Sequence, residues 1–372
     1  MATLRLLLLF LFTLLAGPAG AVPLETEEGF LVPQPGRELE FPHDHGSHPM
    51  FKIEWWYLTG HLFDQRGRRF GYQATFFRYG LQPESSLSGD PFGSRQVHLT
   101  HMALTDPEGE AFHCEERLSR DGWDARARVG QLDVRNGNWS LEMTDNQTGA
   151  LRLRGSIHSD VTFDLHLVPQ KPLIRFGADG TSRKGPAPEA RSYYLSYTRL
   201  MTEGTVHNGE GEFAVAGSSW MDHEIASSQL DSSYTGWDWI AIQLDDGWEV
   251  KAYLLREADG GNSPCSALIW ISPDTDLHYR GPEDFEWDKS LSWTSPETGH
   301  TYPIRPVIRT RHPLSGKQVE FRFEPVMQNQ ELDFPGATYW EGAGDISTTG
   351  EGPTGTAYLE LVGYGGAIRG LN

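Results

Sequence analysis

The sequence predicts an all-β protein built from two related antiparallel β-barrel domains. Short runs in which apolar and polar residues alternate recur along the chain, and long helical periodicities are absent. In residues 161–167 and again in residues 319–324, every second side chain is apolar while its neighbours are polar or charged. Half-buried strands of this kind, separated by short polar turns, are typical of sandwiches and barrels.

Two predicted hairpins look like counterparts of each other. Residues 64–67 (Asp-Gln-Arg-Gly) and residues 245–247 (Asp-Asp-Gly) provide the turns. Each turn follows a Trp-rich run and precedes an aromatic run that ends in arginine. The paired runs are residues 55–63 with 70–78, and residues 237–244 with 248–256. Similar runs at residues 192–199 and 356–364 indicate that each half closes on a comparable strand.

The repeat and the chain length both predict two domains. A chain of this length exceeds what a single core usually serves. We place a signal peptide in residues 1–21, the first barrel domain in residues 22–205 and the second in residues 206–372.

The first residues are typical of a secretory signal. Arg5 precedes an apolar run at residues 6–15, and residues 19–21 (Ala-Gly-Ala) provide small side chains for cleavage. The run is too short to span a membrane, and no longer apolar stretch follows it. We therefore expect an exported monomer, periplasmic or extracellular, without a transmembrane anchor.

Charge and cysteine content narrow the class of protein further. The formal net charge of −20 argues against nucleic acid and anionic membranes as partners. Cys114 and Cys265 are the only cysteines; they either form a disulfide, which export permits, or remain two buried thiols.

Two tracts bring acids, one histidine and three tryptophans close together: residues 220–224 (Trp-Met-Asp-His-Glu) and residues 236–239 (Gly-Trp-Asp-Trp). On a strand, Asp238 faces one way with Ile240, while Trp237 and Trp239 face the other. If the face of Asp238 lines a barrel interior, desolvation would raise its pKa and make it a general acid. The alternative is that Asp238 pairs with an arginine or is capped by backbone amides.

Residues 222–224 form the second candidate set. Histidine titrates near neutrality, and a neighbouring carboxylate can orient its ring. Because adjacent strand residues face opposite ways, Asp222 and Glu224 share a face and His223 needs an acid from elsewhere. The alternative for His223 is a structural histidine bonded to backbone.

Two further Trp–acid pairs are ambiguous in the same way. Glu54 shares an apolar face with Trp56, and we slightly favour a buried carboxylate that pairs with an arginine such as Arg78. Trp340 directly precedes Glu341 late in the chain.

The histidine-rich residues 43–48 have side chains that suit zinc or copper. They lie in a segment flanked by Pro and Gly, so we favour a solvated polar loop and assign no metal. The chain has no G-x-S-x-G elbow, P-loop or dinucleotide fingerprint, so a serine hydrolase has no positive support.

Seven short segments together follow the pattern of one known family: residues 54–62, 76–78, 192–194, 198–200, 220–224, 236–239 and 339–342. They span nearly the whole mature chain in that family's order. By these segments the chain resembles the AttH-like, or carotenoid 1,2-hydratase-like, double-lipocalin family. The resemblance implies two lipocalin-like barrels packed together and a pocket for an apolar ligand, an isoprenoid or a lipid. It also implies chemistry on polyenes that needs no cofactor.

The resemblance also assigns roles to residues. Four of them would handle protons: Asp222, His223, Glu224 and Asp238. Trp220, Trp237 and Trp239 would line the ligand pocket or stabilise a cation through their π faces. We add four further candidate ligand-binding residues from the other Trp–acid tracts: Trp56, Tyr57, Glu54 and Trp340. One departure is Ile225, because the family commonly has Trp after Asp-His-Glu; an aromatic that could shield a carbocation is missing there.

Two functions fit these observations. The first is a cofactor-free hydro-lyase of the carotenoid 1,2-hydratase type, which adds water to an isoprenoid or lipid by acid–base proton transfer. The alternative is a non-catalytic periplasmic carrier or chaperone for an apolar molecule.

Overall fold

The computed structural model describes residues 24–83, 95–122, 124–228, 233–350 and 352–366. The predicted signal peptide lies outside these residues. Within them the only helix is the short 3-10 helix η1 (His43–His45), and no helix is long and apolar enough to cross a membrane. All other regular elements are strands, so the predicted all-β class is confirmed.

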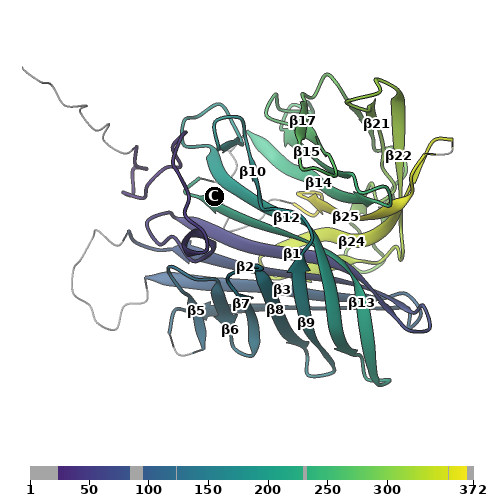
Figure 1. Cartoon of the computed structure of the whole chain (residues 1–372), viewed down its shortest axis with the longest axis horizontal. Helices are drawn as coiled ribbons and strands as arrows, with labels where there is room; N and C mark the ends of the chain where they lie inside the picture. The colour runs from purple at the N-terminus through teal and green to yellow at the C-terminus, as the bar shows by residue number, and fades with distance from the viewer. Residues whose placement is uncertain (1–23, 84–94, 123, 229–232, 351, 367–372) are drawn as a thin grey trace, which may run out of the picture.

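The first sheet has thirteen strands and curls into a nearly closed barrel (Figure 1). Its order is β4-β3-β2-β1-β13-β12-β9-β8-β7-β6-β5, and β10 and β11 also pair with β12. Contacts of β3 and β4 with β6 and β8 bring the two ends of the sheet together. The strands are β1 (Ile53–Asp64), β2 (Arg69–Gly80), β3 (Gln96–Asp106), β4 (Ala111–Arg120), β5 (Ala125–Ala127), β6 (Asp133–Asn136), β7 (Trp139–Asp145), β8 (Ala150–Ile157), β9 (Val161–Pro169), β10 (Ile174–Phe176), β11 (Ser182–Arg183), β12 (Arg191–His207) and β13 (Glu212–Ala226).

The second sheet has ten strands and forms a half-barrel beside the first (Figure 1). Its order is β17-β16-β15-β14-β25-β24-β22-β21-β18, and β23 pairs with β24. The strands are β14 (Tyr234–Leu244), β15 (Glu249–Glu257), β16 (Ala267–Ile271), β17 (Leu277–Arg280), β18 (Glu286–Asp288), β21 (Val307–Arg311), β22 (Gln318–Pro325), β23 (Glu331–Phe334), β24 (Ala337–Thr348) and β25 (Gly355–Val362). A separate two-stranded sheet joins β19 (Trp293–Thr294) to β20 (Thr301–Tyr302).

Both predicted hairpins are present. The first turn joins β1 to β2, and the second joins β14 to β15. Gly67 and Gly247 each have a φ of 88°, a left-handed conformation that glycine adopts at little cost. The two hairpins occupy equivalent places, because each forms the centre of its own sheet.

The chain passes from one sheet to the other between β13 and β14. β13 pairs with both β1 and β12, so it belongs to the first sheet. The expected division at residues 205/206 falls inside the β12–β13 hairpin. In the second sheet β25 lies directly beside β14, so β13, rather than the expected run at residues 192–199, is the counterpart of β25.

The alternation of each central strand separates two environments. One face of β1, which includes Trp56 and Leu58, is buried in the core of the first barrel. The other face carries Tyr57, which packs between the two sheets with Trp239 and Tyr358. This layer between the sheets is where the candidate site lies.

The two cysteines are free thiols in this structure. Cys114 lies on β4 of the first sheet, while Cys265 precedes β16 of the second sheet.

Candidate functional site

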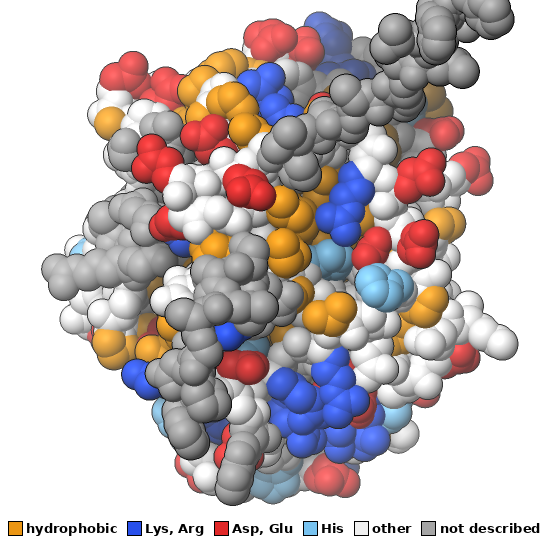
Figure 2. All heavy atoms as spheres, turned by 90° about the vertical axis from the view of Figure 1, so that its left-hand side faces the viewer, with side chains coloured by type: hydrophobic (Ala, Val, Ile, Leu, Met, Phe, Trp, Pro, Cys, Tyr) orange, Lys and Arg blue, Asp and Glu red, His pale blue; other side chains and the backbone are white. Residues whose placement is uncertain are grey.

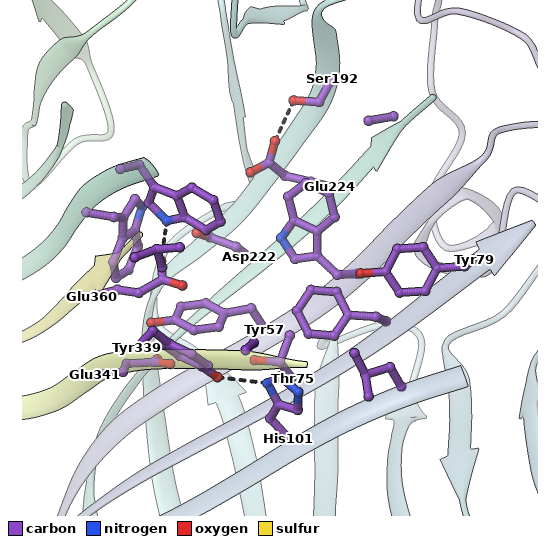
Figure 3. A pocket seen from close by; sticks show the side chains of 18 of the residues that line it. Tyr57, Thr75, Tyr79, His101, Ser192, Asp222, Glu224, Tyr339, Glu341 and Glu360 are labelled. Atoms are coloured by element: carbon purple, nitrogen blue, oxygen red, sulfur yellow. Dashed lines mark hydrogen bonds between the residues drawn. The ribbon is translucent and has the colours of Figure 1, made fainter. Parts of the chain in front are cut away.

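A cavity of about 590 Å³ lies between the two sheets (Figure 3). This volume is within the range of small-molecule pockets. One lining residue, Leu118, is 68 % exposed, so the cavity opens to the surface beside it. Figure 2 views the molecule from the side at which β2 ends, and hydrophobic side chains gather near the middle of that face. The walls of the cavity are mainly aromatic and include Trp55, Tyr57, Phe77, Tyr79, Tyr194, Trp237, Trp239, Tyr253 and Tyr339.

Strand alternation turns four acids of β13, β24 and β25 toward this cavity, which Glu116 of β4 also lines. Asp222 and Glu224 come from one face of β13, while Glu341 comes from β24 and Glu360 from β25. Glu341 and Glu360 are directly opposite each other in the β24–β25 ladder. Directly opposed residues have Cβ atoms about 5 Å apart, so the two carboxyl groups lie within reach of each other.

The Glu341–Glu360 pair lacks a positively charged partner. No Lys or Arg of the described chain lies within ion-pair distance of either carboxyl group. Burial, and then the neighbouring Glu360, raise the pKa of Glu341 well above its usual value. Burial raises the pKa of Glu360 to about 7. At neutral pH this pair therefore holds a proton that it can donate.

Asp222 and Glu224 are held by hydrogen bonds at the opposite wall. Asp222 accepts hydrogen bonds from the Tyr194 hydroxyl at 2.5 Å, from the Trp220 indole at 2.7 Å and from Ser196. Glu224 accepts one from Ser192 at 2.5 Å, and the ammonium of Lys184 lies 3.2 Å away. Burial raises the pKa of both acids, and nearby lysines oppose this rise.

A chain of three side chains links the cavity to its rim. The ring of His101 on β3 lies 2.8 Å from the Tyr339 hydroxyl on β24 (Figure 3). It also lies 3.1 Å from the Glu116 carboxylate on β4. Burial lowers the pKa of His101, so the ring is neutral. A neutral ring that donates to Glu116 accepts the hydrogen bond of Tyr339 at its other nitrogen. This bond also ties the first sheet to the second.

Asp238 lies elsewhere, in the interior of the second barrel. It is fully buried and accepts a hydrogen bond from Arg256, and the ammonium of Lys289 lies 3.2 Å away. The alternative in which Asp238 pairs with an arginine is therefore the one that the structure contains. The predicted alternation of side chains along this strand is confirmed, since Trp237 and Trp239 face away from Asp238 and into the cavity.

His223 faces the interior of the first barrel, opposite to Asp222 and Glu224. Its Nε2 atom lies 2.9 Å from Glu54 Oε1, and its ring stacks on Trp56 at 4.8 Å. The acid from elsewhere that His223 requires is thus Glu54. Arg78 also pairs with Glu54 at 3.1 Å, which is the arrangement we slightly favoured for this acid.

The expectation of a solvated loop at residues 43–48 is wrong. Asp44, His45 and His48 are all buried. His48 donates to Glu54 at 2.8 Å and lies 3.1 Å from Asp44, so a buried carboxylate network draws this segment inward.

His48, Glu54 and His223 are close enough to bind a metal ion together, because their ligand atoms lie within 4.8 Å of one another. However, one Glu54 oxygen already receives both histidine protons, while the other pairs with Arg78. A cation there would lose these hydrogen bonds and be repelled by the guanidinium, so this donor set suits a paired carboxylate better.

The sequence-predicted residues thus fall into three groups. The cavity is lined by Asp222, Glu224, Tyr57, Trp237 and Trp239. The core of the first barrel holds His223, Glu54 and Trp56, and that of the second holds Asp238 and Trp340. Trp220 is buried between the sheets, beneath Asp222, to which it donates a hydrogen bond.

Several cavity residues were missed in the sequence: Glu341 as an acid of the site, Glu360, Tyr339, His101, Glu116 and Tyr194. A signal for three of them was present. Tyr339 precedes Glu341 by two positions, and Tyr358 precedes Glu360 by two, just as Trp220 precedes Asp222. An aromatic residue two positions before an acid places both on one strand face.

Comparison with known proteins agrees with this architecture. A crystal structure of a Nitrosomonas europaea protein assigned to AttH superposes with a TM-score of 0.79 and 33 % identity, covering 90 % of this chain and 99 % of that one. Kievitone hydratase from Nectria haematococca has a TM-score of 0.67 and 15 % identity, with coverage of 87 % and 92 %. CghA in complex with Sch210972 has a TM-score of 0.53 and 12 % identity, with coverage of 91 % and 97 %. The last two show a shared fold alone.

Comparison with curated protein sequences found no match. The AttH-like family model, in contrast, matches residues 32–364, which is nearly the whole described chain. The chain therefore belongs to the AttH-like family.

Proposed function

We propose that this protein is an exported, cofactor-free hydro-lyase that adds water to a double bond of an apolar isoprenoid or lipid in the cavity between the sheets. The observation that carries the proposal is the Glu341–Glu360 pair: two opposed carboxyl groups, raised in pKa, in an aromatic cavity. A general acid works best when its pKa lies near the working pH. The name of kievitone hydratase, which shares the fold, supports the same reaction class.

The chemistry follows from the positions of these groups. The Glu341 carboxylic acid gives its proton to one alkene carbon, and a carbocation forms at the other. The aromatic side chains of Tyr57, Tyr339 and Trp237 line the cavity together with the acid pair, and a cation that sits over one of these rings is stabilised by it. Water then bonds to the cation, and the proton that it loses returns to the Glu341–Glu360 pair. The net change is one water added and no proton gained or lost by the protein.

The test uses an acyclic carotenoid, lycopene, and a set of acyclic isoprenoids incubated with the purified protein in heavy-oxygen water. The expected product is a tertiary alcohol that carries the label. Glu341→Gln removes the transferable proton and should lower the rate at least ~100-fold. Glu203→Gln, an exposed acid on β12, is the matched control and should retain the wild-type rate.

A non-catalytic carrier makes a different prediction for the same experiment. A protein that purifies with bound lipid, and converts none of these polyenes, would be a carrier and would refute the hydro-lyase. Mass spectrometry of the extracted ligand identifies what the cavity holds in either case.

A further inference from the structure

The cavity is lined by more acidic than basic side chains. Lys184 is occupied by Glu224 at 3.2 Å. Lys251 lies with its ammonium 3.2 Å from the centre of the Tyr194 ring and is attracted by Asp222. Each of these two acids thus has a lysine near it, while Glu341 and Glu360 have no cation within ion-pair distance in the described chain.

Unused hydrogen-bonding groups mark the same place. Glu341 is 1 % exposed, and its Oε1 atom makes no hydrogen bond of normal geometry with the described residues. The buried Tyr57 hydroxyl interacts with this carboxyl group, but without normal hydrogen-bond geometry. Glu360 accepts one hydrogen bond, from the Trp237 indole at 2.8 Å. A buried acceptor whose donor is poorly aligned is unfavourable, so a ligand that brings a well-placed donor would satisfy Glu341 better than Tyr57 does.

The walls next to these acids are aromatic. Tyr57 and Tyr339 line the cavity together with Glu341 and Glu360 (Figure 3). Trp237 is a further lining residue. Aromatic faces beside carboxylates form the surroundings that recognise ammonium groups, because both attract positive charge.

We infer that this cavity binds an organic cation, an ammonium group carried on an apolar body, with the ammonium beside Glu341 and Glu360. The inference rests on the proposed function in one respect only, because both assign a ligand to the same cavity. It also deepens that proposal, because an ammonium ion has the charge of the carbocation that hydration would form. An apolar amine should therefore occupy the site as a mimic of that intermediate.

Binding of such a cation should release protons. The ammonium replaces the proton held by the acid pair, so its affinity rises with pH and protons leave as it binds. Other titratable groups line the cavity from the surrounding strands and contribute to the profile: Tyr57, Tyr79, His101, Glu116, Lys184, Tyr194, Asp222, Glu224, Tyr253 and Tyr339. Two more lie outside the lining but interact with its acids, Lys251 with Asp222 and Tyr358 with Glu341.

The experiment compares two probes with the same twelve-carbon tail, dodecylamine and dodecanol, by calorimetry between pH 5.5 and 8. At pH 8 the amine should bind about tenfold more tightly than the alcohol. This preference should fall as the pH is lowered, because protons then compete for the carboxylates. Heats measured in two buffers of different ionisation enthalpy should show protons released with the amine and not with the alcohol.

Glu341→Gln should reduce amine affinity about tenfold and leave alcohol affinity unchanged, while Glu203→Gln should behave as wild type. Equal affinity for the two probes at pH 8, a preference that persists in Glu341→Gln, or binding of neither probe would each overturn the inference. The labelled-water assay judges hydration separately. Amine selectivity without turnover would therefore refute the hydro-lyase alone, and turnover without amine selectivity would refute the cation site alone.

Discussion

Glu54 in the first barrel and Glu341 in the cavity are buried to the same degree, at 0 % and 1 % exposure, yet their surroundings are opposite. Glu54 receives hydrogen bonds from His48, His223 and Arg78, which hold its pKa well below its usual value. Glu341 faces another carboxyl group, and its pKa is raised. Burial alone therefore does not decide whether an acid serves structure or chemistry; the charge of its partners does.

Removing the carboxylate of Glu54 should have the largest effect on stability. In Glu54→Gln the buried Arg78 loses its anionic partner, and breaking such a pair costs about 3–5 kcal/mol of unfolding free energy. Urea unfolding at pH 7 measures this loss. The exposed Glu203→Gln control should change the value by less than about 0.5 kcal/mol, and a loss below about 1 kcal/mol for Glu54→Gln would contradict the assigned structural role.

Glu341→Gln should have the opposite sign, because its carboxylate is unfavourable in the fold. A raised folded pKa means that stability is fully present below the unfolded pKa, about 4.3, and is lost as the pH rises through the folded pKa. Glutamine does not ionise, so the variant does not lose this stability as the pH rises. The variant should be about 1–3 kcal/mol more stable than wild type at pH 8 and nearly equal to it at pH 4.

Glu54 supplies the reversed pH profile for comparison. Its folded pKa is lowered, so its contribution is present above about pH 4.3 and is lost as the pH falls through the folded pKa. The loss of stability in Glu54→Gln should thus become smaller in acid. The gain of stability in Glu341→Gln should also become smaller in acid, so the two differences approach zero from opposite sides. If both variants changed the unfolding free energy in the same direction across this pH range, the opposite surroundings of the two acids would be contradicted.

The sequence predicts which side chains share a face of a strand, but not which side chains of other strands lie opposite that face. Alternation predicted that Asp222 and Glu224 share one face and that Trp237 and Trp239 point away from Asp238, and both predictions hold. It could not distinguish an interior that holds Arg256 from one that is open to a ligand, because that depends on which strands meet across a sheet.

Long-range pairing explains what was missed. Glu341 and Glu360 are direct neighbours only through the β24–β25 ladder, and His101 reaches Tyr339 only because the two sheets pack together. The resemblance named the family and the double barrel correctly. Its proton-handling set included His223 and Asp238, which lie in the two barrel cores rather than in the cavity.

The smallest effect we predict compares two tyrosine hydroxyls of the cavity. The Tyr339 hydroxyl is bonded to His101 at 2.8 Å across the two sheets, whereas the buried Tyr57 hydroxyl has no partner of normal geometry in the described chain. Tyr339→Phe should therefore lower the unfolding free energy by about 1 kcal/mol, since it removes one bond and leaves the Nδ1 atom of His101 without its partner. Tyr57→Phe removes a hydroxyl whose contact with Glu341 is poorly aligned, so its effect should be smaller than that of Tyr339→Phe and close to neutral. Thermal unfolding of both variants measures the difference, and an equal loss in both would mean that the His101–Tyr339 bond does not help to hold the sheets together.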